Sequence, residues 1–306
     1  MFLKLDGGAS GQAMPEVPGV RHSRVRAGEV TLHVAEAGEG PPLVLLHGWP
    51  QHWYLWRDVI PVLAADNRVI CPDLRGFGWS DAPRASYDKE TLARDVIALL
   101  DALGLDRVRL AGHDWGGWTG FLVCLLAPER VERFVALNIP HPFTGHGPRG
   151  LLTLWRFAYQ VPLALPGLGS RTSRWLASWD SARAQRAGMP WDPAETDTFL
   201  GQFAEPARAE AASRVYRSFI TTDMPRSLSS RYRAMRLRTP TLILHGTGDP
   251  AVRPVHLEGY EPYADDLRVE LVPSAGHFIV DEQPDLVATR LRSFLGGSSQ
   301  AGAETG

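Results

Sequence analysis

The sequence has 306 residues, with 32 basic and 34 acidic side chains and a formal net charge of −2. No net basic charge favours nucleic acid as a partner, and no block of like charge indicates an interaction tail. With 44% hydrophobic residues, the chain can bury a full core, as one large domain or as two smaller ones.

The cysteines and the N-terminal residues bear on the cellular compartment. Cys71 and Cys124 are the only cysteines, and both lie in apolar contexts, so no disulfide framework is expected. The first eight residues lack the apolar core of a signal peptide. No apolar run approaches the roughly 20 residues that a membrane helix needs. We therefore expect a cytoplasmic protein without a membrane partner.

The first part of the chain predicts strands alternating with helices. After a lead-in rich in Gly, Ala and Pro, alternating apolar residues from Ser23 to Val34 indicate a hairpin at a sheet edge. Apolar runs typical of strands buried on both faces follow at 42–46, 68–72, 107–111 and 131–137. Helical patterns separate them at 53–64, 87–103 and from the elbow near 114 to about 127. This order predicts an α/β fold with a mainly parallel sheet covered by helices on both faces.

A helical stretch interrupts the alternation. Helical patterns without strand-like runs occur near 151–163, 171–181, 195–203, 210–220 and 226–235. Strand patterns resume at 241–245 and 267–272, and a last amphipathic helix ends at 296–297. The sequence thus predicts a core domain of residues 20–140 and 238–297 and a helical cap of residues 141–237. Flexible termini are expected at 1–19 and 298–306.

One short motif organises the rest of the chain. Gly112-His113-Asp114-Trp115-Gly116 follows an apolar strand pattern and matches the G-x-nucleophile-x-G frame of a strand-to-helix elbow. Asp114 stands where a serine hydrolase carries Ser. The flanking glycines fit because any Cβ in so sharp a turn would strike a neighbouring element. Taken alone, the motif also fits a glycine-rich turn in which Asp caps a helix.

Two further residues complete a candidate triad. Asp249 and His277 each follow a predicted strand, in the loops where parallel sheets carry their catalytic groups. Individually, each is better explained as an ordinary loop residue. Together with Asp114 they give the order nucleophile, acid, histidine, which is that of α/β-hydrolases.

The identity of the nucleophile predicts the kind of reaction. A serine that attacks an sp³ carbon would leave an ether, which water does not readily cleave. A carboxylate that attacks the same carbon leaves an ester. His277 can direct water onto the Asp114 carbonyl of that ester and restore the enzyme. Asp114 therefore predicts displacement at an alkyl carbon.

From these residues the chain resembles the α/β-hydrolase superfamily over about 23–296 and, within it, the epoxide hydrolases. His47-Gly48-Trp49-Pro50 is similar to their H-G-x-P motif, and the loop 73–81 to their D-x-x-G-x-G loop. The resemblance implies a cis bond before Pro50 and an oxyanion hole formed by the backbone amides of Trp49 and Trp115. We expect His47 to brace this loop rather than to react.

The resemblance also implies two cap tyrosines that hydrogen-bond and protonate the departing epoxide oxygen. Tyr159, followed by Gln160, and Tyr216, between Val215 and Arg217, occupy the matching motif positions. The competing interpretation is that both are packing residues, since tyrosines at helical spacing usually are. Tyr232, the third tyrosine of the predicted cap, is the reserve candidate.

A second family shares the same triad. Haloalkane dehalogenases use the Trp after the nucleophile as a halide donor, so Trp115 fits them too. Their second donor is often an Asn at the position of Trp49, or else a cap tryptophan. The candidates for a cap donor are Trp155, Trp175 and Trp179. Fluoroacetate dehalogenases usually place Arg near the nucleophile, where this chain has Trp115 and Trp118, so an anionic substrate is not expected.

The resemblance thus implies an epoxide hydrolase that forms a covalent ester on Asp114. The expected partner is a small apolar epoxide, with no nucleic acid. No cofactor is expected, and no Cys/His cluster with metal-ligand spacing is present. The alternatives are a haloalkane dehalogenase and a ligand receptor that keeps the pocket without turnover. Monomer and homodimer remain equally compatible with the sequence.

Overall fold

An eight-stranded sheet forms the centre of the computed structural model, which describes residues 12–143, 154–229, 231–273 and 275–296. The strands are β1 (Arg21–Ala27), β2 (Val30–Ala37), β3 (Pro42–Leu46), β4 (Arg68–Pro72), β5 (Val108–His113), β6 (Val131–Leu137), β7 (Thr241–Gly246) and β8 (Leu267–Val272). Their order is β1-β2-β4-β3-β5-β6-β7-β8. β1 and β2 pair antiparallel, as do β2 and β4, and all other pairs are parallel. The expected mainly parallel sheet with a hairpin at its edge is confirmed.

The central strands are apolar throughout because helices cover both faces of the sheet. Along β3, Val44 and Leu46 join one core cluster, while Leu43 and Leu45 join the other. This alternation follows from the two-residue period of a strand. The first cluster lies under α2 (Lys89–Ala102) and α3 (Trp115–Leu126). The second lies under α1 (Ile60–Leu63), α11 (Ile279–Glu282) and α12 (Pro284–Gly296).

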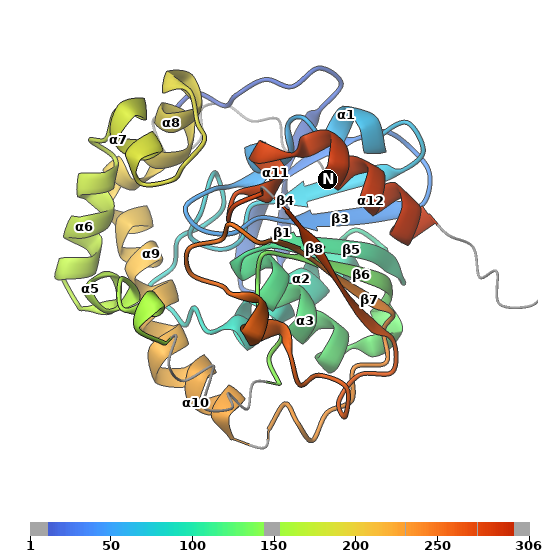
Figure 1. The fold of residues 1–306 in the computed structure, drawn as a ribbon. Coiled ribbons are helices and arrows are strands. Elements are labelled where there is room, and N and C mark those ends of the chain that lie inside the picture. Colours follow the sequence, from blue (N-terminus) through green and yellow to red (C-terminus); the bar gives the residue numbers. More distant parts are fainter. Residues whose placement is uncertain (1–11, 144–153, 230, 274, 297–306) are drawn as a thin grey trace, which may run out of the picture.

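Between β6 and β7, the described residues have an isolated β-bridge at Leu237 and, as their regular elements, only helices. They are η3 (Leu154–Phe157), α5 (Gln160–Ala164), α6 (Leu168–Leu176), α7 (Ser181–Arg186), α8 (Pro193–Leu200), η4 (Gly201–Ala204), α9 (Pro206–Ser218), the π-helix η5 (Phe219–Asp223) and α10 (Met224–Leu228). We call them the inserted helices. Figure 1 shows them, in yellow-green to orange, along one side of the sheet and its flanking helices. α9 is central to the group, because it packs against both α5 and α6.

Three expected helices have different bounds in the structure. The helix expected at 53–64 is divided into the 3₁₀ helix η1 (Trp53–Trp56) and α1, which starts beside Pro61. A proline ring fixes φ and lacks an N–H, so it suits a helix start rather than an interior. The helix expected at 171–181 ends at Leu176, and Asp180 caps a separate α7. The helix expected at 226–235 ends at Leu228, because Ser229 is extended at ψ 176°.

The start of the described chain is packed more closely than a loose lead-in would be. The Gln12 side-chain amide donates to the carbonyls of Asp197 and Thr198, each at 2.9 Å, and Val17 is buried in the core. The other residues of the expected flexible termini, 1–11 and 298–306, lie outside the described residues, as do 151–153 of the helix expected at 151–163.

Two findings bear on the expectations about disulfides and membrane helices. Cys71 and Cys124 are buried and unbridged. Across the described ranges, no helix has the length and apolar character that crossing a membrane requires.

Candidate active site

Asp114 sits on a strained turn between β5 and α3. Its φ of 49° and ψ of −124° are uncommon for a residue with a side chain. A Cβ on Gly112 would lie 2.4 Å from the Gly116 carbonyl oxygen, and one on Gly116 would lie 2.5 Å from the His47 carbonyl oxygen. The glycines of the motif therefore allow the chain to turn tightly enough to present Asp114 above the sheet.

The Asp114 carboxylate is bound by backbone N–H groups. Its Oδ2 accepts a hydrogen bond of 2.9 Å from the Trp49 amide, and the Trp115 amide also helps to stabilise the anion. A Cβ on Gly48 would come within 2.4 Å of the Asp114 Cβ, so the loop can approach only as glycine. Burial raises the pKa of Asp114, an effect that the charge of His277 and the two amides oppose.

His47 holds this loop through both ring nitrogens. Nδ1 donates to the Gly48 carbonyl at 3.0 Å, and Nε2 accepts from the Leu74 amide at 2.9 Å. The expected cis peptide bond between Trp49 and Pro50 is confirmed. His47 is fully buried, and with both nitrogens engaged it has no pair of electrons to offer a substrate.

His277 and Asp249 form a tight pair beside Asp114. His277 Nδ1 donates to Asp249 Oδ2 at 2.7 Å. Burial would raise the pKa of Asp249, but the His277 charge and several hydrogen bonds hold it well below its usual range. Burial opposes a charge on His277, yet Asp249 and then Asp114 raise the pKa of this ring to about 9. The resting site therefore favours an imidazolium between two carboxylates.

Asn138 was not foreseen as part of the site. It follows β6 and has a φ of 48°. Its Nδ2 donates to Asp249 Oδ2 at 3.0 Å and to the Gly276 carbonyl at 2.9 Å. Its Oδ1 accepts from the Gly246 amide. Asn138 thus ties the end of β6 to the loops that carry Asp249 and His277. The only sequence signal was a polar residue directly after a buried strand, in the conformation that Asn tolerates best.

An apolar cavity of about 400 Å³ opens above the triad. Asp114, His277, Trp115 and Tyr159 line it, with apolar walls from both the core and the inserted helices. The walls include Trp118, Ile139, Phe157, Phe219, Met224 and Val252. No Lys or Arg occurs among the described lining residues, so the cavity suits an uncharged apolar molecule.

Tyr159 and Tyr216 lie next to each other, with ring centroids 6.3 Å apart. The Tyr159 side chain is 46% exposed and reaches the cavity from the residue before α5. Tyr216 is buried on α9 and meets the rings of Trp49 and Trp115 edge-on, at 5.4 and 5.6 Å. Desolvation raises the pKa of both hydroxyls, and the Asp114 charge adds to this in each case. Both tyrosines therefore stay protonated.

The structure does not bring every sequence candidate to the cavity. Tyr232 is buried elsewhere and donates to Glu90 Oε1 at 3.2 Å. Trp155 and Trp175 are 68% and 57% exposed, and neither lines the cavity, nor does Trp179. Of the tryptophans considered, Trp115 and Trp118 of the core line the cavity, and the candidates in the helical segment do not.

Among the residues that the structure describes, no group of three or more His, Cys, Asp or Glu side chains is arranged to hold a metal ion. The polar side chains among the residues that line the cavity are those of Asp114, Tyr159, Gln160, Ser227, His256 and His277.

Similarity to known proteins agrees with this geometry. The family described as alpha/beta hydrolase fold matches residues 41–284. Epoxide hydrolase 4 of Homo sapiens is 29% identical over 287 residues, covering 89% of this chain and 77% of that protein. Fluoroacetate dehalogenase of Burkholderia sp. is 29% identical over 306 residues, covering 90% and 94%. Among solved structures, epoxide hydrolase CorEH without ligand has a TM-score of 0.78 at 26% identity, covering 90% of this chain and 99% of that one.

Proposed function

We propose that this chain, which belongs to the alpha/beta hydrolase family, is an epoxide hydrolase that adds water to a small apolar epoxide and releases a vicinal diol. The observation that carries the proposal is a pair of neighbouring tyrosines: Tyr159 lines an apolar cavity together with Asp114, and Tyr216 is buried directly beside Tyr159 and Trp115. An epoxide needs both a nucleophile for carbon and a proton donor for oxygen. The similarity to epoxide hydrolases supports the same assignment.

In the first step, Asp114 attacks an epoxide carbon. Its Oδ2 is held by the Trp49 amide, which leaves Oδ1 for the attack. A C–O bond forms to Asp114 as the ring C–O bond breaks, and the epoxide oxygen takes a proton from a tyrosine. The raised pKa of Tyr159 and Tyr216 keeps each hydroxyl protonated until this alkoxide, a much stronger base than water, develops.

In the second step, the ester is hydrolysed. Esterification removes the Asp114 charge that helps to raise the pKa of His277. The ring then loses its proton more readily, which restores the tyrosine and leaves a neutral base. His277, oriented by Asp249, takes a proton from water as the water oxygen attacks the Asp114 carbonyl carbon. The amides of Trp49 and Trp115 stabilise the resulting oxyanion. Its collapse breaks the bond between the Asp114 carbonyl carbon and the alkyl oxygen. That oxygen takes the remaining proton of the attacking water as Asp114 returns to a carboxylate, and the diol is released.

We further propose that the inserted helices act as a cap over the cavity. They contribute Tyr159, Phe157, Phe219 and Met224, whereas the core contributes the nucleophile and the base. Closing an apolar wall over the ester limits the water that can reach it and strengthens the hydrogen bonds within the site.

The test is a trapping experiment on the covalent ester. The purified protein is mixed with styrene oxide, 1,2-epoxyhexane and matched 1-haloalkanes, and both diol and halide are measured. In His277→Gln, the ester should accumulate as a mass increase equal to that of the epoxide and map to Asp114. Asp114→Asn is the matched control, which should show neither the ester nor diol formation. A wild-type protein that releases no diol, or an Asp114→Asn variant of undiminished activity, would refute the proposal.

A second candidate, a haloalkane dehalogenase, is favoured by Trp115 and Trp118, which line the cavity and carry indole N–H groups of the kind that can donate to a halide. Replacing Tyr216 with Phe separates the two functions. Diol formation should fall about 100-fold, since proton transfer by a positioned group contributes on this order. Halide release needs no proton donor and should hardly change. Initial rates on the paired substrates decide between them, and diol formation unaffected by Tyr216→Phe would favour the dehalogenase.

A further inference from the structure

Lys89, the first residue of α2, has a fully buried side chain beside the proposed active site. A buried ammonium is costly unless it is paired, because it has lost its hydration. Burial lowers the pKa of Lys89, and nearby carboxylates, chiefly Asp223, oppose that effect. The reaction proposed above assigns no role to Lys89.

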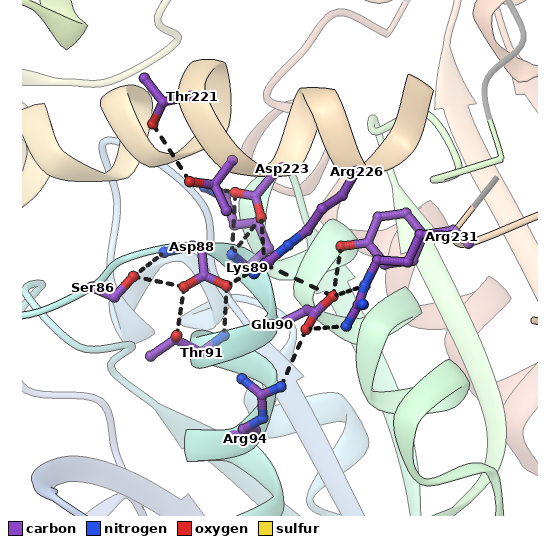
Figure 2. A network of polar contacts seen from close by, with 12 residues as sticks. Ser86, Asp88, Lys89, Glu90, Thr91, Arg94, Thr221, Asp223, Arg226 and Arg231 are labelled. Atoms are coloured by element: carbon purple, nitrogen blue, oxygen red, sulfur yellow. Dashed lines mark hydrogen bonds and ion pairs between the residues drawn. The ribbon is translucent and has the colours of Figure 1, made fainter. Parts of the chain in front are cut away.

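The inserted helices supply the partners of the ammonium. Nζ lies 3.6 Å from Asp223 Oδ2 and donates to the Val215 carbonyl at 3.3 Å. The Lys89 backbone N–H also donates to both carboxylate oxygens of Asp223, at 3.0 and 3.2 Å. Figure 2 shows Asp223, on the π-helix, directed toward the start of α2. Burial raises the pKa of Asp223 to about 6, with Lys89 as the main opposing charge.

The same ammonium faces an aromatic ring of the core. Nζ lies 4.2 Å from the centroid of the Trp115 ring, within the range of a cation–π interaction. Trp115 follows the nucleophile Asp114 in the chain, and Val215 precedes Tyr216. Lys89 therefore contacts the neighbours of both groups that act on an epoxide, while the rings of Trp115 and Tyr216 meet edge-on at 5.6 Å.

We propose that Lys89, held by Asp223, is a positioning residue of the epoxide-opening step, which fixes Tyr216 of α9 against Trp115 of α3. The inference rests on the proposed function. It concerns alkylation, because the contacts of Lys89 reach the neighbours of Asp114 and Tyr216 and include neither His277 nor Asp249. Small displacements are sufficient to matter, since moving a reacting group by about 1 Å can cost on the order of 100-fold in rate.

Neighbouring ion pairs provide a control at the same junction. Arg231 donates to both carboxylate oxygens of Glu90 on α2, at 2.7 and 2.9 Å. It joins the same helix, α2, to the turn that follows α10 (Figure 2). The Arg231 side chain is 49% exposed, whereas Glu90 is buried. Removal of Arg231 still leaves Glu90 with Arg94 and Tyr232 as partners, so this carboxylate is not left unpaired.

The test uses the double variant Lys89→Met/Asp223→Asn. Both charges are removed together, and the Asn amide oxygen can still accept from the backbone N–H of residue 89. Single-turnover rapid quench with styrene oxide, followed by mass spectrometry, gives the rates of ester formation and ester decay. Ester formation should be slower by about 10- to 100-fold, and decay should change less than about 2-fold. Arg231→Met should alter neither rate.

The outcomes are distinct. A double variant that forms the ester at the wild-type rate, or that loses both steps equally, overturns the positioning role. If the double variant does not fold, Asp223→Asn alone replaces it; slower ester formation with normal decay supports the role, and wild-type rates overturn it. Wild-type protein that forms no ester at all contradicts the proposed function instead. The two ideas can therefore fail separately.

Discussion

At the scale of single residues, the site combines charges that each depend on a neighbour. His277 lies between Asp249 and Asp114, and this raises its pKa to about 9. The proposed mechanism uses His277 as a base, yet the two carboxylates favour its protonated form before the reaction begins. Under the proposed mechanism, formation of the ester lowers the pKa of His277, because a neutral Asp114 no longer favours the imidazolium. Charge at the nucleophile would thus determine when the base becomes available.

This coupling predicts the titration of His277. The carboxylates favour the charged ring, so its pKa lies above the ordinary value near 6.5, and removing one carboxylate must lower it. In Asp114→Asn, which imitates the neutral ester, the pKa of His277 should fall from about 9 by on the order of one unit. NMR titration of the histidine ring protons measures it. His22, whose pKa is lowered to about 4 by burial and by His33, is the internal control. An unchanged His277 pKa would contradict the coupling.

At the scale of elements, the β5–α3 elbow positions Asp114, the residue proposed as the nucleophile. The turn requires a backbone conformation that few residues with side chains adopt, and it brings Gly112 and Gly116 against other backbone atoms. The unfavourable free energy of this backbone conformation must be offset by the surrounding sheet, in which β5 is hydrogen-bonded to β3 on one side and to β6 on the other. A rigid parallel sheet is what keeps Asp114 in a strained position.

Substituting one elbow glycine should therefore destabilise the whole protein. In Gly112→Ala, the new Cβ would lie 2.4 Å from the Gly116 carbonyl oxygen, a backbone atom that cannot move without distorting α3. We expect a loss on the order of 3 kcal/mol in the free energy of unfolding. Gly296→Ala is the matched control, because no atom lies within 4 Å of its Cβ position. Urea unfolding followed by circular dichroism compares them, and equal midpoints would show that the elbow tolerates a side chain.

At the scale of the whole molecule, the inserted helices are bonded directly to the loops that carry the sequence motifs. Gln202 of η4 accepts from the Gly78 amide at 2.9 Å and donates to the Pro50 carbonyl at 2.8 Å. Arg208 of α9 donates to the Ser80 carbonyl at 3.1 Å. All three side-chain contacts are buried. Lys89 adds a further buried contact between the core and the inserted helices, from α2 to the π-helix that carries Asp223.

Local rules made much of this protein readable from its sequence. Apolar runs of strand length, separated by helical periodicity, determine an α/β sheet, because burial on both faces demands them. The glycines around Asp114 indicate the elbow, since the turn admits no Cβ there. Asp249 and His277 follow strands that end at the same edge of a parallel sheet, so their order along the chain was sufficient to place them together. His47 and the cis bond before Pro50 followed from the resemblance of a four-residue motif.

Only the tertiary structure decided which residues of the helical segment meet the core. Lys89 and Val215 lie 126 positions apart, and nothing local to either indicates their contact. Tyr232 resembles the other tyrosines in sequence, yet it bonds to Glu90, while Trp155 and Trp175 face outward. Periodicity shows that a helix has an apolar face but not which neighbour that face meets. That choice depends on packing between distant segments. Here it brings Tyr159 to the cavity, buries Tyr216 against Trp49 and Trp115, and places Lys89 beside Trp115.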